Sequence, residues 1–140
     1  MSKQDYTSVM HKSLSIFLIC LLLVACASEK RNMGLKNSLD LYDSSLRWGE
    51  FSKAKKLQKD QDEVLDYNFL KDIKVTSVEE KERNISDDGL QVDRVVEIRY
   101  YDRRVGIEKT IFDKEIWLYD PERELWGLDS ELPDFEEIQE

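Results

Sequence analysis

The sequence predicts an α+β domain in which N-terminal helices pack on a bent antiparallel sheet. Apolar residues recur at helical spacing between residues 35 and 57. Between residues 73 and 128, runs of alternating apolar and polar residues are typical of strands, and the connections contain Asp, Gly and Pro in turn-forming combinations. Helices first and strands afterwards favour one helical layer on a concave face of the sheet.

The first helix is predicted from a single apolar stripe. Leu35, Leu39, Tyr42 and Leu46 recur at i, i+4, i+7 and i+11, the spacing of one face of an amphipathic helix. Trp48-Gly49 then interrupts the pattern. We expect the helix to end there.

A second, shorter amphipathic helix is expected to follow. Its apolar positions are Phe51, Ala54 and Leu57. We interpret its lysines as a solvated helix face, with a binding patch as the alternative. These lysines are Lys53, Lys55, Lys56 and Lys59.

Four runs predict strands, at residues 73–78, 91–101, 105–119 and 124–128. Turn sequences precede the second run (Ser-Asp-Asp-Gly, residues 86–89) and the last run (Asp-Pro-Glu-Arg, residues 120–123). In the second run, one face is predicted to carry Val92, Arg94, Val96, Ile98 and Tyr100.

The third run is long and changes phase. Val105, Ile107 and Ile111 share one parity. The later apolar positions take the other parity: Phe112, Ile116 and Leu118. A phase switch within one strand predicts a β-bulge near residues 110–112 that bends the sheet.

The first 25 residues have the pattern of a secretory signal peptide. Residues 1–12 are polar and contain Lys3 and Lys12, whereas residues 14–25 are almost purely apolar. As a helix this apolar run would span about 18 Å, too short for a hydrocarbon core of about 30 Å. An ordinary signal peptide that contains a cysteine, or a buried apolar helix, are the alternatives.

The end of the apolar run, Leu23-Val24-Ala25-Cys26, resembles the lipobox of bacterial lipoproteins. The resemblance implies cleavage between Ala25 and Cys26 and acylation of Cys26, including palmitate, by three chains that bind a bilayer stably. Asp after the cysteine favours retention in the inner membrane in many Gram-negative bacteria. Because Ala27 stands there, we expect the periplasmic face of the outer membrane, with the inner membrane as the alternative.

Four segments are therefore expected. Residues 1–25 are the signal peptide, and residues 26–34 are the lipidated cysteine and a short polar tether of about 20–30 Å when extended. Residues 35–135 form one α+β domain, and residues 136–140 form an acidic tail.

Composition excludes several functions. The net charge of −9 becomes −10 when Lys3, Lys12 and Asp5 are removed with the signal peptide, and such a charge repels nucleic acid. His11 and Cys20 would be removed as well, which leaves Cys26 for the lipid. Zinc or copper sites built on imidazole or thiolate, and Ser-His-Asp or Cys-His catalysis, are then excluded from the mature domain. We expect no cofactor.

The helical segment further resembles the first helix pair of nuclear-transport-factor-2-like, or SnoaL-like, domains. The residues that carry this resemblance are Leu41-Tyr42, Leu46-Arg47-Trp48-Gly49-Glu50-Phe51 and Ala54. The stretches Trp117-Leu118-Tyr119 and Leu125-Trp126-Gly127-Leu128 suit the same cone-shaped fold, and the resemblance implies that the domain is cone-like. Residues 126–135 further resemble the C-terminus of small proteobacterial lipoproteins. Such domains include isomerases, dehydratases, transport factors and binding modules, so the resemblance assigns no catalytic residue.

Two residue groups are candidate sites. The acidic cluster at residues 60–66 has Leu65 and Lys71 where a calcium loop of the EF-hand kind, counted from Asp60, needs Gly and Glu, so we expect a solvated surface. The aromatic residues are expected to form core. If the cone is open, Tyr42, Tyr100 and Asp102 would line a pocket for a small apolar ligand.

The sequence thus favours a membrane-anchored periplasmic lipoprotein that binds the bilayer through Cys26 and acts as a non-catalytic protein-interaction or envelope-assembly module. The alternative is a small-ligand binder, or a carboxylate-dependent isomerase-like enzyme, that uses the cone interior.

Overall fold

The computed structural model of the protein describes residues 3–60, 62 and 64–135, and the chain divides into two compact units, Met1–Gly34 and Leu35–Glu140. The described residues of the first unit all belong to helix α1 (Lys3–Arg47). No helix in the described ranges has a stretch long and apolar enough to cross a bilayer. Residues 26–34, expected as an extended tether, are helical, which reduces their rise from about 3.4 Å to about 1.5 Å per residue.

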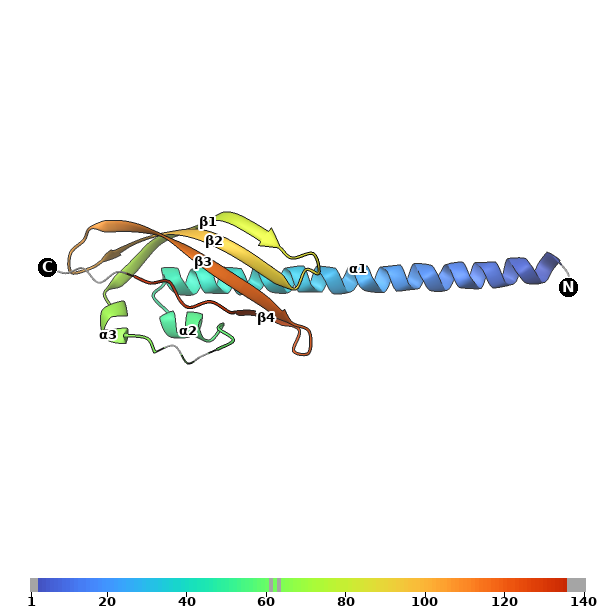
Figure 1. Ribbon diagram of the computed structural model, residues 1–140, viewed down its shortest axis with the longest axis horizontal. Coiled ribbons are helices and arrows are strands. Elements are labelled where there is room, and N and C mark those ends of the chain that lie inside the picture. Colours follow the sequence, from blue (N-terminus) through green and yellow to red (C-terminus); the bar gives the residue numbers. More distant parts are fainter. Residues whose placement is uncertain (1–2, 61, 63, 136–140) are drawn as a thin grey trace. The chain divides into compact units, whose positions relative to one another are not determined.

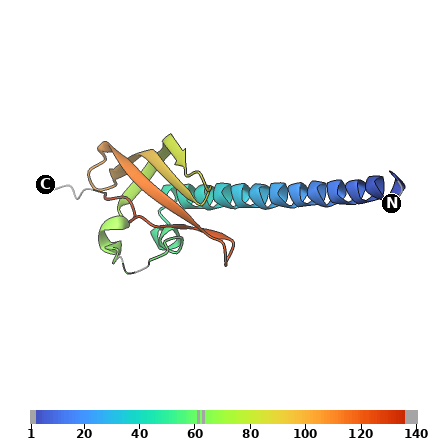
Figure 2. The ribbon, with the colours of Figure 1, turned by 45° about the vertical axis from the view of Figure 1, so that its right-hand side comes forward.

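The second unit confirms the α+β prediction. After α1 its elements are α2 (Phe51–Lys55), α3 (Tyr67–Leu70), β1 (Ile73–Ile85), β2 (Gln91–Asp102), β3 (Glu108–Asp120) and β4 (Leu125–Leu128). The strands form an open antiparallel meander in the order β1-β2-β3-β4. The C-terminal part of α1, together with α2 and α3, lies on one side of this sheet (Figure 1). In Figure 2 the twisted strands cross the last turns of α1 obliquely.

The apolar stripe predicted for the first helix is confirmed, because its four residues are all buried. The helix ends in a Schellman motif, in which the Gly49 N–H donates to the Leu46 carbonyl and the Glu50 N–H to the Ser45 carbonyl. Gly49 has a φ of 71°, a left-handed conformation that a residue with a Cβ adopts only at a cost. The short helix α3 was not predicted; Asp66 caps it by accepting the N–H groups of Asn68 and Phe69.

The predicted inner face of β2 is also confirmed, and it packs against the stripe of α1. Tyr42 meets Trp117 of β3 edge to face at 5.5 Å between ring centroids. The C-terminal segment closes the other end of the core, where the Phe135 ring contacts the rings of Tyr100 and Phe51. Side chains therefore fill the space between helix and sheet.

The predicted β-bulge in the third run is wrong. Strand β3 begins at Glu108 rather than Val105, and it pairs with β2 from Tyr101–Glu108 to Gln91–Leu118 without a register shift. Its odd-numbered side chains face inward throughout, although two of them are Asp113 and Glu115. The even-numbered apolar residues Phe112 and Ile116 are exposed on the outer face.

The parity switch lies in β1 instead, which continues beyond its predicted end to Ile85. Its register with β2 shifts between Val75 and Ser77, and again between Glu80 and Glu82. The first shift moves the inward positions from odd to even numbers, so that Glu80 faces the helix side of the sheet.

Replacing Leu46 by Ala should lower the free energy of unfolding by about 2–5 kcal/mol, because Leu46 is fully buried and its truncation leaves a cavity. Leu41, on the same helix but 38% exposed, is the matched control, and Leu41→Ala should cost less than about 1 kcal/mol. Urea unfolding followed by tryptophan fluorescence measures both. Equal losses would contradict this packing.

Candidate functional site

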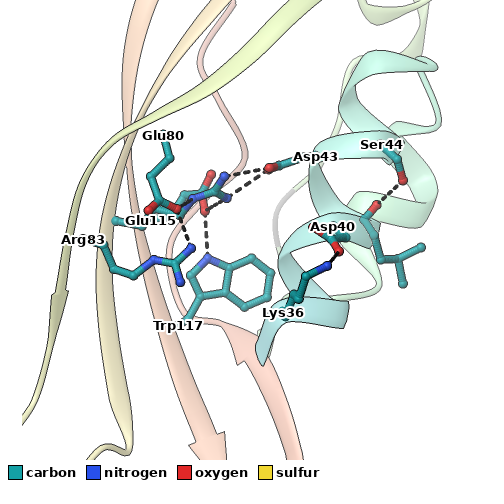
Figure 3. Close-up of polar contacts among 10 residues, drawn as sticks. Lys36, Asp40, Asp43, Ser44, Glu80, Arg83, Glu115 and Trp117 are labelled. Atoms are coloured by element: carbon teal, nitrogen blue, oxygen red, sulfur yellow. Dashed lines mark hydrogen bonds and ion pairs between the residues drawn. The ribbon is translucent and has the colours of Figure 1, made fainter. Parts of the chain in front are cut away.

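A buried arginine lies on the inner face of the sheet. Arg94 of β2 is only 4% exposed, and its guanidinium contacts three carboxylates from three other elements. They are Asp43 of α1, Glu80 of β1 and Glu115 of β3 (Figure 3). These four residues are termed the Arg94 cluster.

Every edge of the guanidinium is used. Nη1 and Nη2 donate to the two carboxylate oxygens of Asp43, at 2.9 and 2.6 Å. Nε donates to Glu80 Oε2 at 2.9 Å, and Nη1 also donates to Glu115 Oε2 at 3.0 Å. The indole Nε1 of Trp117 donates to the same Glu115 oxygen at 2.8 Å (Figure 3). One side chain thus fastens α1 to three strands.

The backbone register explains why these side chains meet. Arg94 and Glu115 are paired directly across β2 and β3. Glu80 reaches the same face because of the register shift after Val75. Asp43 follows Tyr42 in α1, next to the buried stripe, so it points toward the sheet rather than into solvent (Figure 3).

The cluster holds more carboxylates than cations. Burial raises the pKa of Glu115 to about 7, although the contacts with Arg94 and Trp117 favour the ionised form. Burial also raises the pKa of Asp113, on the same face of β3, to about 6. Glu115 Oε1 and Asp113 Oδ2 are buried without a hydrogen-bond partner in the described part of the chain. We therefore expect Glu115 to be partly protonated near neutral pH.

Glu80 and Arg94 both shift toward their charged forms, because the pKa of Glu80 is lowered and the pKa of Arg94 is raised. Burial opposes ionisation of Glu80, but its contacts with Arg83 and Arg94 outweigh that effect and lower its pKa. Burial likewise opposes the charge of Arg94, but the hydrogen bonds that Arg94 donates to Asp43 and the negative charge of Glu115 raise its pKa above the ordinary value. Arg94 therefore remains a cation at every accessible pH.

A carboxyl group with a pKa near 7 has the acidity of a catalytic acid or base. Glu115 is fully buried, however, and it does not line the surface groove that reaches Arg94. That groove, of about 420 Å³, is lined by Lys36, Leu39, Asp40, Asp43, Val78, Glu80, Arg83 and Arg94. Among the described residues, no group of His, Cys, Asp or Glu is placed to hold a metal ion. We interpret the cluster as a structural clamp.

The three residues predicted for a ligand pocket have separate partners. Tyr42 and Tyr100 are fully buried against Trp117 and Phe135, respectively. Asp102 closes the turn between β2 and β3, where its carboxylate pairs with the side chain and the N–H of Arg104. These contacts lower the pKa of Asp102.

The other predicted residues are not members of the cluster. Ala25 and Cys26 belong to the helical backbone of α1, and their side chains are not among the described ones. In the acidic segment, Asp60 and Asp62 line a surface groove beside Ser130, and Glu63 lies outside the described residues.

The alternation of residues in β2 correctly predicts that Arg94 lies on the buried face, but its carboxylate partners were not predicted. The available signal was Arg94 itself, since a buried guanidinium requires carboxylates nearby. Glu115 was missed because the apolar residues Phe112 and Ile116 suggested the opposite inward parity for β3. Comparison of the chain with protein-family models, curated proteins and solved structures gave no significant match.

Replacing Glu115 by Gln should make stability less dependent on pH. Because its pKa is raised in the folded protein, that state binds more protons than the unfolded one between about pH 4.5 and 7. The contribution of Glu115 to the free energy of unfolding therefore falls as pH rises through this range. Gln keeps an acceptor oxygen without a charge, so relative to wild type the variant should gain up to about 3 kcal/mol at pH 8 and much less at pH 4.5.

Urea unfolding at pH 4.5, 6 and 8 measures this difference. Glu122→Gln, in the exposed turn after β3, is the control and should change stability by a similar small amount at each pH. A pH-independent difference between Glu115→Gln and wild type would contradict the raised pKa.

Replacing Arg94 by Met should lower the free energy of unfolding by about 3–5 kcal/mol at pH 8, because the buried carboxylates lose their cation. Arg99→Met, on the same strand but 42% exposed in its side chain, should cost less than about 1 kcal/mol. Thermal unfolding followed by circular dichroism compares the two variants, and equal effects would argue against a clamp at Arg94.

Proposed function

We propose that this protein is a lipoprotein of the bacterial cell envelope, anchored through Cys26, whose domain binds another protein and catalyses no reaction. The observation that carries the proposal is the sequence Leu23-Val24-Ala25-Cys26 at the end of a short apolar run. In this proposal residues 1–25 are removed by cleavage, and the mature chain is held at the periplasmic face of the outer membrane by acyl chains.

The proposed domain is a cone-like member of the nuclear-transport-factor-2-like group whose interior is closed. A ligand site in such a cone would need an apolar cavity with a few polar groups. Here the inner positions are occupied by side chains such as Tyr42, Val96, Tyr100 and Trp117, each fully buried. This packing favours a role for the outer surface over a small-ligand or isomerase-like function of the interior.

The anchor is tested by replacing each cysteine in turn. Cys26→Ala should abolish incorporation of labelled palmitate and leave the protein as uncleaved precursor or unlipidated product. Cys20→Ala, within the apolar run, is the matched control and should be labelled like the wild type. Equal labelling of Cys26→Ala and wild type would contradict the lipoprotein assignment.

The binding role is tested on the intact protein in cells. Formaldehyde crosslinking, purification from membranes and mass spectrometry should enrich one envelope protein with the wild type and not with Cys26→Ala. A purified protein that carries no crosslinked partner would contradict the interaction role.

A further inference from the structure

A further groove lies between the helical layer and the hairpin formed by β3 and β4. It has a volume of about 490 Å³ and is bounded by α1 at residues 37–41, by residues 56–59 after α2, and by residues 118–127. Apolar side chains line it, among them Leu41, Leu57 and Trp126. Leu41 and Leu125 are 38% and 62% exposed, so apolar surface remains in contact with water there. This groove is termed the hairpin groove.

The charge of the hairpin groove is opposite to that of the chain. Among the described residues that line it, the cations are Lys56, Lys59 and Arg123 and the single carboxylate is Asp120, in a protein of net charge −9. Asp120 already accepts the N–H groups of Glu122 and Arg123 within its turn. The described lining of the groove therefore carries a net positive charge on an anionic domain.

Backbone hydrogen bonds fix the position of Lys59 in the groove. The Lys59 N–H donates to the Leu128 carbonyl, and the Leu128 N–H donates to the Leu57 carbonyl, so this segment runs along the edge of β4. A Cβ at Gly127 would lie 2.6 Å from Cγ of Lys59. The absence of a side chain at Gly127 thus leaves room for the aliphatic stem of Lys59. The stem packs against the backbone there, so Lys59 is more restricted than a lysine on a solvated helix face.

The neighbouring carboxylates hold these cations weakly. Lys59 Nζ lies 3.8 Å from Asp129 and Arg123 Nε lies 3.8 Å from Asp120, and the pairs are exposed. Ion pairs of this kind contribute roughly 0–1 kcal/mol, so a better-placed carboxylate would replace them at little cost.

The net positive charge belongs to the lining of the hairpin groove, and this limits the kind of molecule that can bind there. Charges are screened beyond about 8 Å at physiological salt. A nucleic acid or an anionic bilayer surface extends well beyond that distance and would meet the negative remainder of the domain. A short protein segment with acidic and apolar side chains meets only the groove itself, and it would cover Leu41 and Leu125 as well.

We infer that the hairpin groove is the docking site for an acidic, partly apolar segment of a partner protein in the envelope, an inference that rests on the proposed interaction role. Carboxylates of that segment pair with Lys56, Lys59 and Arg123, and its apolar side chains cover Leu125 and the groove floor.

Zero-length carbodiimide crosslinking of the full-length protein in membranes tests this inference, because the reagent joins a lysine amine only to a carboxylate in contact with it. Tandem mass spectrometry should find Lys56 and Lys59 joined to Asp or Glu of another protein. Lys53, exposed on α2 outside the groove, should show no such link. An internal link between Lys36 and Asp40, which do not line the groove, shows that the reaction has worked.

Arg123→Glu provides the sharper comparison, since it reverses one groove charge and leaves both reporter lysines in place. Its partner links should fall roughly tenfold, whereas Lys53→Glu should leave them unchanged. Links that persist in Arg123→Glu, links to a second copy of this chain, or no partner link at either lysine would overturn the inference.

Formaldehyde crosslinking of the same variants separates the two proposals. A partner captured equally by wild type and Arg123→Glu, without groove links, would overturn the groove and leave the interaction role standing. No partner with either reagent would overturn both.

Discussion

The guanidinium of Arg94 joins the helical layer to the sheet, because it contacts Asp43 of α1 while it also contacts Glu80 and Glu115 on the neighbouring strands. Removing a cation and carboxylates from water is costly, and the mutual attraction offsets that cost only where the geometry satisfies most polar atoms. The bidentate contact with Asp43 and the added donor from Trp117 provide such geometry. The cluster thereby joins α1 to β1, β2 and β3 at this point.

Much of the sheet follows from this constraint. Glu115 must face inward to reach Arg94, so β3 keeps odd-numbered residues inside and leaves Phe112 on the outer face. Glu80 reaches the same side only because β1 shifts register after Val75. The domain thus combines an apolar core with one buried charged cluster, and the surplus of carboxylates in that cluster links its stability to pH.

The surface of this acidic domain includes one region lined mainly by cations, the hairpin groove. The chain is strongly acidic, yet Lys56, Lys59 and Arg123 gather at the hairpin groove beside exposed leucines. The interior is occupied by packed aromatic and aliphatic side chains. The cations and apolar side chains of the hairpin groove are thus on the surface, which agrees with the proposed role as an interaction module held near a membrane.

The sequence by itself determined the features that depend on local periodicity and turn chemistry. The buried stripe of α1, the stop at Gly49, the inner face of β2 and the two hairpin turns were predicted because each is encoded within a few consecutive residues. The tertiary structure alone decided the parity of β3, the register shifts of β1 and the assembly of the Arg94 cluster. These features depend on partners 14 to 51 residues apart in the chain. When charged residues such as Glu115 take the buried positions of a strand, its apolar residues lie on the outer face, and the apolar pattern then predicts the wrong buried face.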